Sequence, residues 1–600
     1  MKRFLPITTW IVALLIVAGA LLYFEADLLW KLQEQNLFLN TTIFFQEQMV
    51  VPGGLLSWAG TYLTQFFYYP WLGTLLLCLC WLLLMWLVKR AFRIPDKWTA
   101  LTLVPVALLL ITIVDMGYWV YILKLPGHAF VGTLGAIAVA ALLWVFRALS
   151  LPHVPRIVSL IFIVITALLG FPLLGIYGLA ATLLMGIYIW QTEQQLWQKI
   201  AGSVLALCGA AVVPQLCYRF VYYQTNLANI YYAELPLFVV TEEHHEYYLP
   251  YYGLALFFVL MAVGARLAKI IKAEKWGKWG GIVAQGILVA ALVWGVMHWW
   301  FKDENFHHEL KMQHYIEQND WQGVVADAAL QKDEPTRAIV MMRNLALSRL
   351  GRQAEDMYLY KNGSRRYEAP FDMRMMLCVG PLIYYQYGMI NYSARLSTEM
   401  GVEFGWRVSN LKQLAKCAIL NKEENASRKY LGLLSHTTFY GDWAKKAREM
   451  DELKMVKRMM HYSNQLTGDM GNVEEFLMNR LAESTYKDDE MFQEQTLLAS
   501  LWTKDTNQFW YHFSDYTTMH PHARIPRYFQ EAAYLYGKLE GRTYIDQMPF
   551  DQNVKQSFDS FMQAAERFDD TDIEYAREGL KAFCHTFYYD YYLMNELPEY

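Results

Sequence analysis

The sequence predicts an all-α protein: a polytopic bundle of about nine transmembrane helices, followed by a soluble domain of helical repeats. Long apolar runs recur through residues 1–301, and no later run is long and apolar enough to cross a bilayer. The second half instead repeats apolar residues at spacings of three and four, which is typical of amphipathic helices. We therefore expect a transmembrane domain at 1–301 and a separate domain at 302–600.

The candidate spans are apolar runs close to the length of about 20 residues that a helix needs to cross the hydrocarbon core. They are Leu5–Phe24, Trp71–Val88, Trp98–Val114, Ala129–Phe146, Ile157–Leu169, Leu173–Trp190, Ile200–Tyr222, Tyr251–Leu267 and Trp279–Phe301. The turn Gly170-Phe171-Pro172 predicts that the fifth and sixth runs form a hairpin. One broken helix is the alternative, and it would reverse the side of every later loop.

The basic residues predict the orientation of the bundle, because Lys and Arg are retained on the cytoplasmic side. They cluster before the first run and in alternate links: Lys2, Arg3, Lys89, Arg90, Arg93, Lys97, Arg147, Arg156, Lys199, Arg266, Lys269, Lys272, Lys275 and Lys278. This pattern places the N-terminus inside and the C-terminal domain outside. The first run has an alternative interpretation as a cleavable signal peptide that ends near Ala18-Gly19-Ala20, but its length favours a retained span.

The composition excludes several classes of function. A net charge of -4 indicates no nucleic-acid partner. The seven cysteines include no CxxC pair, so they predict buried thiols rather than a disulfide scaffold or a zinc site.

Three segments of the second half share one pattern of helix, turn and helix. They are Ala338–Tyr358, Ile383–Glu399 and Lys412–Leu433, with turns at Gly351, Gly388 and Asn421. The turns are roughly 33 to 37 residues apart, which is close to the spacing of tetratricopeptide repeats. Stacked helix pairs present extended surfaces, so we expect this domain to bind a protein partner.

The aromatic run Phe587-Tyr588-Tyr589-Asp590-Tyr591-Tyr592 lies near the C-terminus. So much aromatic area is unfavourable in water. We expect it to dock onto the repeat domain or onto the membrane surface.

Carboxylates at the outer ends of the spans are the best candidates for chemistry, because a charge at membrane depth is costly. Glu25 and Asp27 follow the first span and open the outer loop 25–70, where short interfacial helices are expected. Asp115 ends the third span. These three acids are the predicted catalytic residues.

Further polar residues lie in the same outer loops. Lys124, Arg219 and Glu234 are candidates for substrate binding. The cluster Glu242, Glu243, His244 and His245 is a candidate metal site, since histidine beside carboxylates suits a divalent metal ion or proton transfer.

In topology, the first half resembles the C superfamily of membrane glycosyltransferases, whose members place an acid just after the first span at the head of a long outer loop. The double-acid signature of its mannosyltransferases is replaced here by Glu25-Ala26-Asp27, which departs from it. The resemblance implies that Asp27, or Glu25, is the general base. It also implies that Asp115 and Glu242–Glu246 bind a divalent metal or a polyprenyl-phosphate donor, with Lys124 or Arg219 on the phosphate.

The whole chain resembles uncharacterised nine-span membrane proteins of gut-type Gram-negative bacteria, through the phrases MMRNLALSRLGR, YYQYGMINYSAR and ASRKYLGLL. The resemblance implies a bacterial inner-membrane protein with a periplasmic C-terminal domain, in contact with membrane lipids. We expect a glycosyltransferase that moves a sugar from a polyprenyl-phosphate carrier to an acceptor. The alternative is a non-catalytic scaffold whose repeat domain binds a partner in envelope assembly or secretion.

Overall fold

The computed structural model describes residues 5–150, 155, 157–192, 195–222, 226, 229–236, 245–270, 278–363, 375–461, 466, 473–568 and 572–594. Within these residues every regular element is a helix, so the all-α prediction is confirmed. The chain forms two compact units. Unit 1 contains Met1–Lys302 with Phe404–Ser409 and Gly432–Asp442, and unit 2 contains Asp303–Glu403, Asn410–Leu431 and Trp443–Tyr600.

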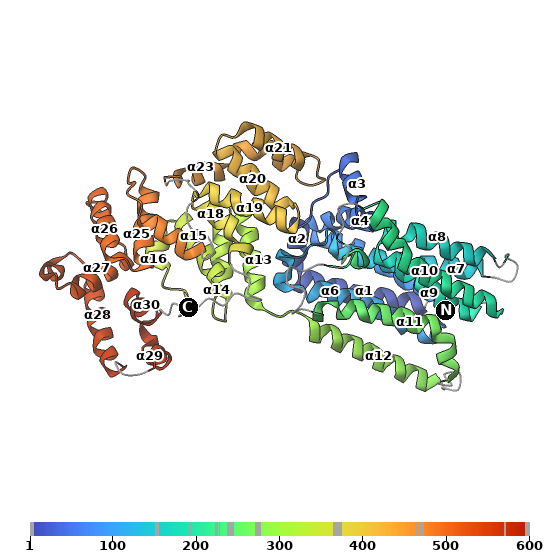
Figure 1. Ribbon diagram of the computed structural model, residues 1–600. Helices are drawn as coiled ribbons and strands as arrows, with labels where there is room; N and C mark the ends of the chain where they lie inside the picture. The colour runs from blue at the N-terminus through green and yellow to red at the C-terminus, as the bar shows by residue number, and fades with distance from the viewer. Residues whose placement is uncertain are drawn as a thin grey trace. The chain divides into compact units, whose positions relative to one another are not determined.

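Unit 1 is a helical bundle (Figure 1). Its helices are α1 (Leu5–Phe24), α2 (Ala26–Glu34), α3 (Thr42–Gln48), α4 (Gly54–Thr64), α5 (Pro70–Phe92), α6 (Leu103–Val114), α7 (His128–Leu149), α8 (Ile157–Leu174), α9 (Ile176–Thr192), α10 (Leu196–Phe220), α11 (Leu249–Ile270) and α12 (Lys278–Trp299). Among the described residues, seven helices are long and apolar enough to cross a membrane, and α9 and α11 hold two shorter apolar stretches. Each predicted run corresponds to one of these seven helices or two shorter stretches. By length and composition, the described helices are therefore consistent with a membrane protein.

Helices α8 and α9 form the predicted hairpin, but its turn comes later than the sequence indicates. Pro172 lies inside α8, and the break falls at Gly175, whose φ of +57° suits glycine. The two helices cross closely, because a Cβ on Gly178 would lie 2.2 Å from the carbonyl carbon of Gly170. Glycines at the crossing let two apolar helices approach, as is common in membrane bundles.

The predicted outer loop contains three short helices. Thr41 caps α3 by accepting a hydrogen bond from the Phe44 amide at 3.2 Å, and Gly53 precedes α4 with a φ of +84°. Helix α2 is buried along most of its length, including the side chains of Lys31 and Glu34, which pair at 3.4 Å. Thus α2 packs within unit 1.

A segment from much later in the chain packs against α2 and the residues that follow α6 in unit 1. Arg407 is 3% exposed and donates to the carbonyl oxygens of Tyr121 at 2.7 Å and Leu123 at 3.1 Å, and also to the Gln35 side chain. Desolvation lowers the pKa of its guanidinium to about 10. The next amide, that of Val408, donates to the carbonyl of Asn36 at 3.2 Å.

The segment 432–442 docks beside it. The hydroxyl of Tyr440 and the side-chain amide of Gln33 exchange hydrogen bonds of 2.7 and 2.9 Å, and Phe439 stacks on Tyr68 at 4.9 Å between ring centroids. The Asn40 amide donates to the carbonyl of His436 at 2.9 Å. These two segments explain why unit 1 includes residues outside 1–302.

Unit 2 holds most of the remaining helices. They are α13 (Glu304–Glu317), α14 (Trp321–Leu330), α15 (Arg337–Arg349), α16 (Gln353–Asp356), α17 (Met375–Cys378), α18 (Gly380–Gln386), α19 (Ile390–Phe404), α20 (Val408–Leu420), α21 (Glu424–Ser435), α22 (Gly441–Lys446), α23 (Asp451–Arg458), α24 (Val473–Ala482), α25 (Glu490–Thr503), α26 (Thr506–Met519), α27 (Arg527–Leu539), α28 (Gln552–Ala565), α29 (Ile573–Gly579) and α30 (Phe587–Leu593). The ends of α19, α20, α21 and α22 reach into the two segments that belong to unit 1.

The three predicted helix–turn–helix segments correspond to α15–α16, α18–α19 and α20–α21. Gly351 and Gly388 turn the chain with φ of +65° and +84°, and Lys422 does so after Asn421 with a φ of +60°. Neighbouring pairs are joined by polar contacts as well as by packing, since Asn421 donates to Asn391 at 2.8 Å.

The aromatic tail docks onto unit 2. Thr586 caps α30, and Phe587 and Tyr588 are fully buried in the main core of the unit. The Phe587 amide donates to the buried carboxylate of Glu531 at 2.7 Å, while Arg527 binds the same carboxylate. Of the two predicted docking surfaces, the helical domain is the one that the tail occupies.

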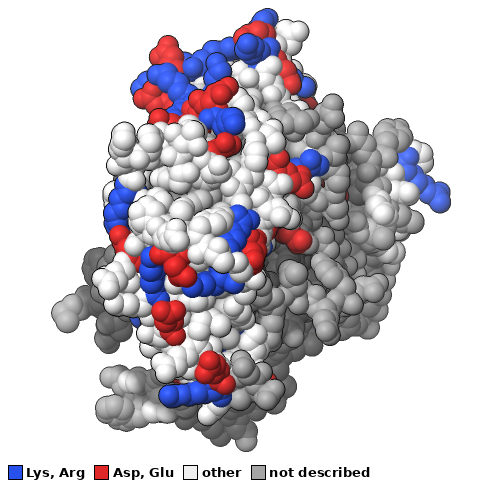
Figure 2. All heavy atoms as spheres, turned by 90° about the vertical axis from the view of Figure 1, so that its left-hand side faces the viewer, with Lys and Arg blue, Asp and Glu red and all other residues white. Residues whose placement is uncertain are grey.

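The visible surface of the C-terminal helices carries charges of both signs. Figure 2 shows Lys and Arg interspersed with Asp and Glu rather than gathered by sign. Ion pairs such as Arg458 with Asp489 at 2.8 Å and Lys487 with Asp515 at 3.3 Å match this pattern. A mixed surface of this kind favours solubility over attraction to a polyanion.

Candidate functional site

A cavity of about 980 Å³ lies within unit 1. Its walls come from α7, α9, α10 and α11, and residues between α10 and α11 cover one end. Helix α9 packs against both α10 and α11. Leu207 on α10 and Val259 on α11 both line the cavity and are exposed, so it is open on that flank of the unit.

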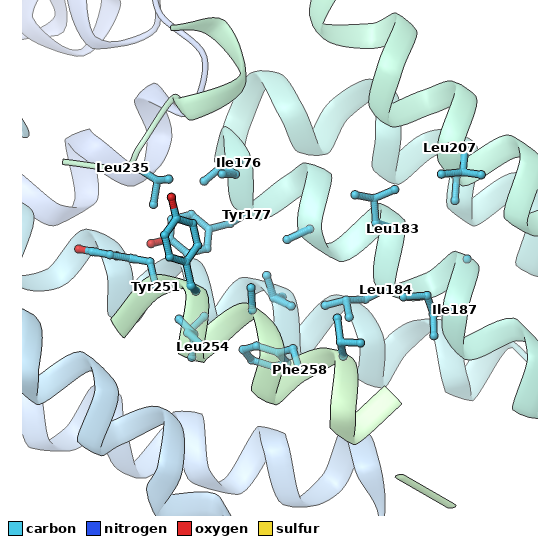
Figure 3. A pocket seen from close by; sticks show the side chains of 18 of the residues that line it. Ile176, Tyr177, Leu183, Leu184, Ile187, Leu207, Leu235, Tyr251, Leu254 and Phe258 are labelled. Atoms are coloured by element: carbon cyan, nitrogen blue, oxygen red, sulfur yellow. The ribbon is translucent and has the colours of Figure 1, made fainter. Parts of the chain in front are cut away.

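Most of the cavity is apolar. Figure 3 shows Leu183, Leu184 and Ile187 of α9 facing Leu254 and Phe258 of α11 along its length. Such a surface matches hydrocarbon, because apolar ligands are bound by burial of apolar area.

One end of the cavity carries hydroxyl groups, from Tyr177 at the start of α9 and Tyr251 at the start of α11 (Figure 3). The Tyr177 ring lies directly on Gly135 of α7, where a Cβ would come within 2.4 Å of the ring. A Cβ on Gly132 would lie 3.5 Å from the Tyr177 hydroxyl oxygen and 3.7 Å from the Tyr251 ring. The two tyrosines therefore lie side by side over α7.

The Tyr177 hydroxyl is buried and has no hydrogen-bond partner within the described part of the protein. A buried hydroxyl without a partner costs free energy, so the Tyr177 hydroxyl is a local cost that the packing against α7 encloses.

A short segment closes this end of the cavity. It comprises residues 229–236, with the 3-10 helix η4 (Ile230–Tyr232), and Leu235 faces the cavity. The Ile176 amide donates to the carbonyl of Ala233 at 3.0 Å, and the Tyr248 hydroxyl donates to that of Pro236 at 2.7 Å. The segment is thus fixed to the first turn of α9 and to the start of α11.

Glu234 lies in this closing segment and is 7% exposed. The Ser57 hydroxyl lies 2.8 and 2.9 Å from its two carboxyl oxygens. Desolvation raises the pKa of Glu234 to about 8, although the Ser57 hydrogen bond acts in the opposite direction. At neutral pH the carboxyl group is therefore mostly protonated and uncharged.

The backbone around Glu234 is built to hold it. Glu234 has a φ of +75°, which is unusual for a residue with a side chain. Its Cγ occupies the space beside Gly53 and Gly175, where a Cβ would lie 2.1 and 2.9 Å away. Strain at a buried titratable residue next to a cavity is typical of functional sites.

Glu25 and the end of α6 lie at the same end of unit 1. The indole of Trp300 donates to Glu25 at 2.5 Å, and the amide of Phe301 donates to the carbonyl of Val114 at 3.0 Å. Glu25 is 1% exposed, whereas Asp27 and Asp115 are partly exposed. None of these three acids is among the residues that line the cavity.

The predicted substrate-binding residues are distributed around the unit. Glu234 adjoins the cavity through Leu235. Arg219 lies exposed in the last turn of α10, which contributes to the wall. Lys124 lies over the ring of Phe404, with its ammonium nitrogen 5.8 Å from the ring centroid.

The predicted metal cluster lies outside the described residues: Glu242, Glu243 and His244 are not described, and of His245 only the backbone, in η5 (His245–Tyr248), is. Elsewhere in the described chain no group of three His, Cys, Asp or Glu side chains is placed to hold a metal ion.

Sequence reasoning missed Tyr177 and Tyr251. Both open apolar helices, and the pattern of Tyr251, Leu254 and Phe258 at spacings of three and four would have placed the second tyrosine on one helical face. No pattern within one helix shows that this face borders a cavity.

A family model for a family of unknown function, DUF6057, matches residues 2–595. Comparisons with curated proteins and with solved structures found no match. Since the match extends over nearly the whole chain, across both units, the protein belongs to the DUF6057 family.

Proposed function

We propose that the protein is an integral membrane enzyme that holds a lipid in the cavity of unit 1 and transfers a sugar at the closed end of that cavity. The observation that carries this proposal is the shape and lining of the cavity. It is apolar along α9 and α11, hydroxyl-lined at one end, and open on a flank that consists of exposed apolar side chains.

The reaction proposed is transfer from a polyprenyl-phosphate carrier to an acceptor hydroxyl. The acceptor oxygen forms a bond to the anomeric carbon, and the bond from that carbon to the phosphate oxygen breaks. The phosphate leaves with the electron pair, and the acceptor proton passes to a carboxylate, for which Asp27 or Glu25 is proposed. Arg219 or Lys124 would balance the charge of the leaving phosphate. The reaction is proposed for the periplasmic face of a bacterial inner membrane.

Two observations support the placement of chemistry at this end of unit 1. The buried carboxyl group of Glu25 is fixed by Trp300, so its position does not depend on solvent. Glu234 precedes Leu235, which lines the cavity, and its pKa near 8 allows proton exchange around neutral pH.

Lipid binding can be tested by filling the cavity. Ala255→Phe adds a ring on a residue of α11 that lines the cavity, while Leu256→Phe adds one to its exposed neighbour outside it. Mass spectrometry of the purified protein should find co-purifying lipid with wild type and Leu256→Phe, and less with Ala255→Phe. Equal lipid in all three proteins would show that the cavity does not hold it.

The transfer step needs its own assay. A labelled polyprenyl-phosphate sugar and membranes containing the protein should yield a labelled product, and Asp27→Asn or Glu25→Gln should reduce its rate 100-fold or more, roughly the effect of removing a general base. If the protein binds lipid but transfers sugar to no acceptor, it is a lipid-binding protein and the proposed enzyme activity is wrong.

The second proposal is a non-catalytic scaffold whose unit 2, with tetratricopeptide-like stacking, binds a protein in envelope assembly or secretion. The consecutive pairs α15–α16, α18–α19 and α20–α21 favour it, since paired helices expose extended surfaces. A photo-crosslinker at Lys429, exposed on α21, should then capture one partner in cells. Asp27→Asn should not affect that capture. If the protein is a scaffold, neither wild type nor Asp27→Asn should yield a transfer product.

A further inference from the structure

A surface of aromatic rings lies in unit 1 beside the start of the apolar helix α5. Its members, in the order of their contacts, are Phe45, Trp58, Tyr62, Phe66, Phe439 and Tyr69. Neighbouring ring centroids in this series are 5.4 to 6.4 Å apart. Five of the rings come from α3, α4 and the residues before α5, and Phe439 comes from the segment 432–442. We call this set the ring surface.

The ring surface is open to its surroundings. Phe45, Tyr62 and Tyr69 are 38%, 42% and 47% exposed, and the other three rings are partly exposed. Ile43, on the same short helix as Phe45, is 67% exposed. A contiguous apolar area of this kind marks a site of contact with a protein, a ligand or a membrane rather than with water alone.

Helix α5 indicates which of these covers the ring surface. It is long and apolar enough to cross a membrane. Its exposed apolar side chains lie at spacings of three and four and form one stripe: Trp71, Leu75, Leu79, Leu83 and Trp86. An apolar stripe along a membrane-spanning helix faces hydrocarbon. Tyr69 lies immediately before this stripe, so the ring surface reaches the level at which contact with lipid begins.

The length of α5 places the ring surface at the edge of the hydrocarbon core. The basic residues Lys89 and Arg90 lie in the last turn of α5 and mark one edge, because charged side chains stay outside the core. From Arg90 back to Tyr69 the chain rises about 30 Å, which equals the thickness of the core. Tyr69 therefore lies at the opposite edge, where tyrosine and tryptophan are enriched.

The segment 432–442 is suited to the same level. Phe439 lies on Tyr69, with ring centroids 5.9 Å apart, and stacks on Tyr68 at 4.9 Å. From Leu433 to Gly441 the segment contains no Asp, Glu, Lys or Arg. Contact of this stretch with the edge of a bilayer therefore removes no such charge from water, which would be costly.

We infer that the ring surface, together with the segment 432–442, lies in the headgroup layer of the bilayer on the side where α5 begins. The apolar faces of the rings contact the upper parts of the acyl chains, and the tyrosine hydroxyls remain with headgroups and water. A segment of the second half of the chain, whose sequence predicts no span, thus becomes a membrane-surface element. The inference rests on the part of the proposed function that places unit 1 in a bilayer, and on neither the lipid in the cavity nor sugar transfer.

Photo-crosslinking tests this placement on the full-length protein in vesicles of phosphatidylethanolamine and phosphatidylglycerol. p-Benzoylphenylalanine replaces one residue at a time, and mass spectrometry of the digested protein measures how much of each probe peptide carries lipid. Probes at Phe439 and at Tyr62 should carry lipid about tenfold more often than a probe at Tyr575, which is exposed on α29 of unit 2. A tenfold ratio corresponds to about 1.4 kcal/mol in favour of the contact with lipid. Leu79, exposed midway along α5, is the positive control.

The outcomes separate the inference from the proposal beneath it. Lipid on the Leu79 probe, with the Phe439 or the Tyr62 probe no higher than Tyr575, would overturn the inference while unit 1 stays in the bilayer. A crosslink from either ring to a second copy of the chain in place of lipid would do the same. If the Leu79 probe carries no lipid, the inference fails together with the membrane setting of the proposed function. Tyr62 is exposed, so its probe still tests the ring surface if the Phe439 derivative does not fold.

Discussion

Glu234 illustrates how a residue can be recognised as polar in the sequence and yet acquire its properties only from the fold. The sequence places it in a loop after an apolar run, where a carboxylate is ordinarily solvated. The structure encloses it between Gly53, Gly175 and Ser57, which come from two other parts of the chain. The pKa near 8 follows from that enclosure.

The titration of Glu234 predicts a pH dependence of stability. The unfolded carboxyl titrates at 4.5 and the folded one at about 8, so the unfolded state ionises first as pH rises. The contribution of this group to the free energy of unfolding is fully present below pH 4.5. It decreases by roughly a few kcal/mol as the pH rises from 4.5 to about 8. Thermal unfolding from pH 5 to 9 should show a decline that Glu234→Gln reduces.

The exposed Glu47 provides the matched control for this measurement. Glu47→Gln should leave the pH profile of the melting temperature as it is in wild type. A Glu234→Gln profile that parallels wild type would mean that Glu234 is ionised in the folded protein.

Other residues of the site follow the same rule. Glu25 is predictable as an acid at the end of the first span, but its bond to Trp300 joins residues 275 positions apart. The unpartnered hydroxyl of Tyr177 depends on where α7 and α11 lie. Contacts of this range have no local signature, because local patterns report only helical faces and turns.

At the scale of elements, the apolar runs predicted helices well, and their ends less well. The hairpin of α8 and α9 forms as predicted, but Pro172 is accommodated inside α8 and the break moves to Gly175. Helical proline is tolerated in membrane helices, where neighbouring elements satisfy the freed carbonyls. The carbonyl that Pro172 frees is that of Leu168, while its own carbonyl, in the last turn of α8, accepts from the Gly53 amide at 2.9 Å.

The segment around Arg407 predicts a large stability effect. Arg407→Gln removes the donors for the carbonyls of Tyr121 and Leu123, leaving buried acceptors unsatisfied. We expect unit 1 to lose about 2–4 kcal/mol, since each buried unsatisfied group costs about 1–3 kcal/mol. Arg395→Gln, which removes an exposed pair with Glu399, should cost under about 1 kcal/mol.

Denaturant unfolding of the purified variants, followed by fluorescence, measures this difference. Similar midpoints for Arg407→Gln and Arg395→Gln would show that the segment 404–409 contributes little to unit 1.

The docked helix α30 makes a separate prediction for unit 2. Phe587 is fully buried, so Phe587→Ala should destabilise the unit by about 3–5 kcal/mol. Tyr592 lies on the same helix and is 37% exposed, so Tyr592→Ala should cost clearly less. Limited proteolysis of both variants should show faster cleavage within unit 2 for Phe587→Ala only; equal protection would contradict the docking of α30.

For the whole molecule, the composition changes near Trp300, and the main boundary between the two units lies between Lys302 and Asp303. That change did not predict that the segments 404–409 and 432–442 belong to unit 1. No pattern within these segments reveals their partners, which lie in the loop 25–70 and at Tyr121 and Leu123.

The topology proposed from basic residues is testable with single cysteines in an otherwise cysteine-free protein. Lys97→Cys lies in the basic link before the third apolar run, and Lys429→Cys lies in the helical domain; both positions are exposed. A membrane-impermeant thiol reagent should label only Lys429→Cys in spheroplasts, and both after lysis. Labelling of Lys97→Cys alone before lysis would reverse the orientation.

The bond between Gln33 and Tyr440 spans 407 positions in the chain. At a synthesis rate of 5–20 residues per second, Gln33 waits about 20–80 s before Tyr440 is made. During that interval Arg407 is not yet made, so the carbonyls of Tyr121 and Leu123 and the Gln35 side chain are open to other molecules. The rate of translation thus sets the time during which a chaperone or lipid can bind there. A transcript that ends before codon 404 produces a unit 1 that lacks the segments 404–409 and 432–442.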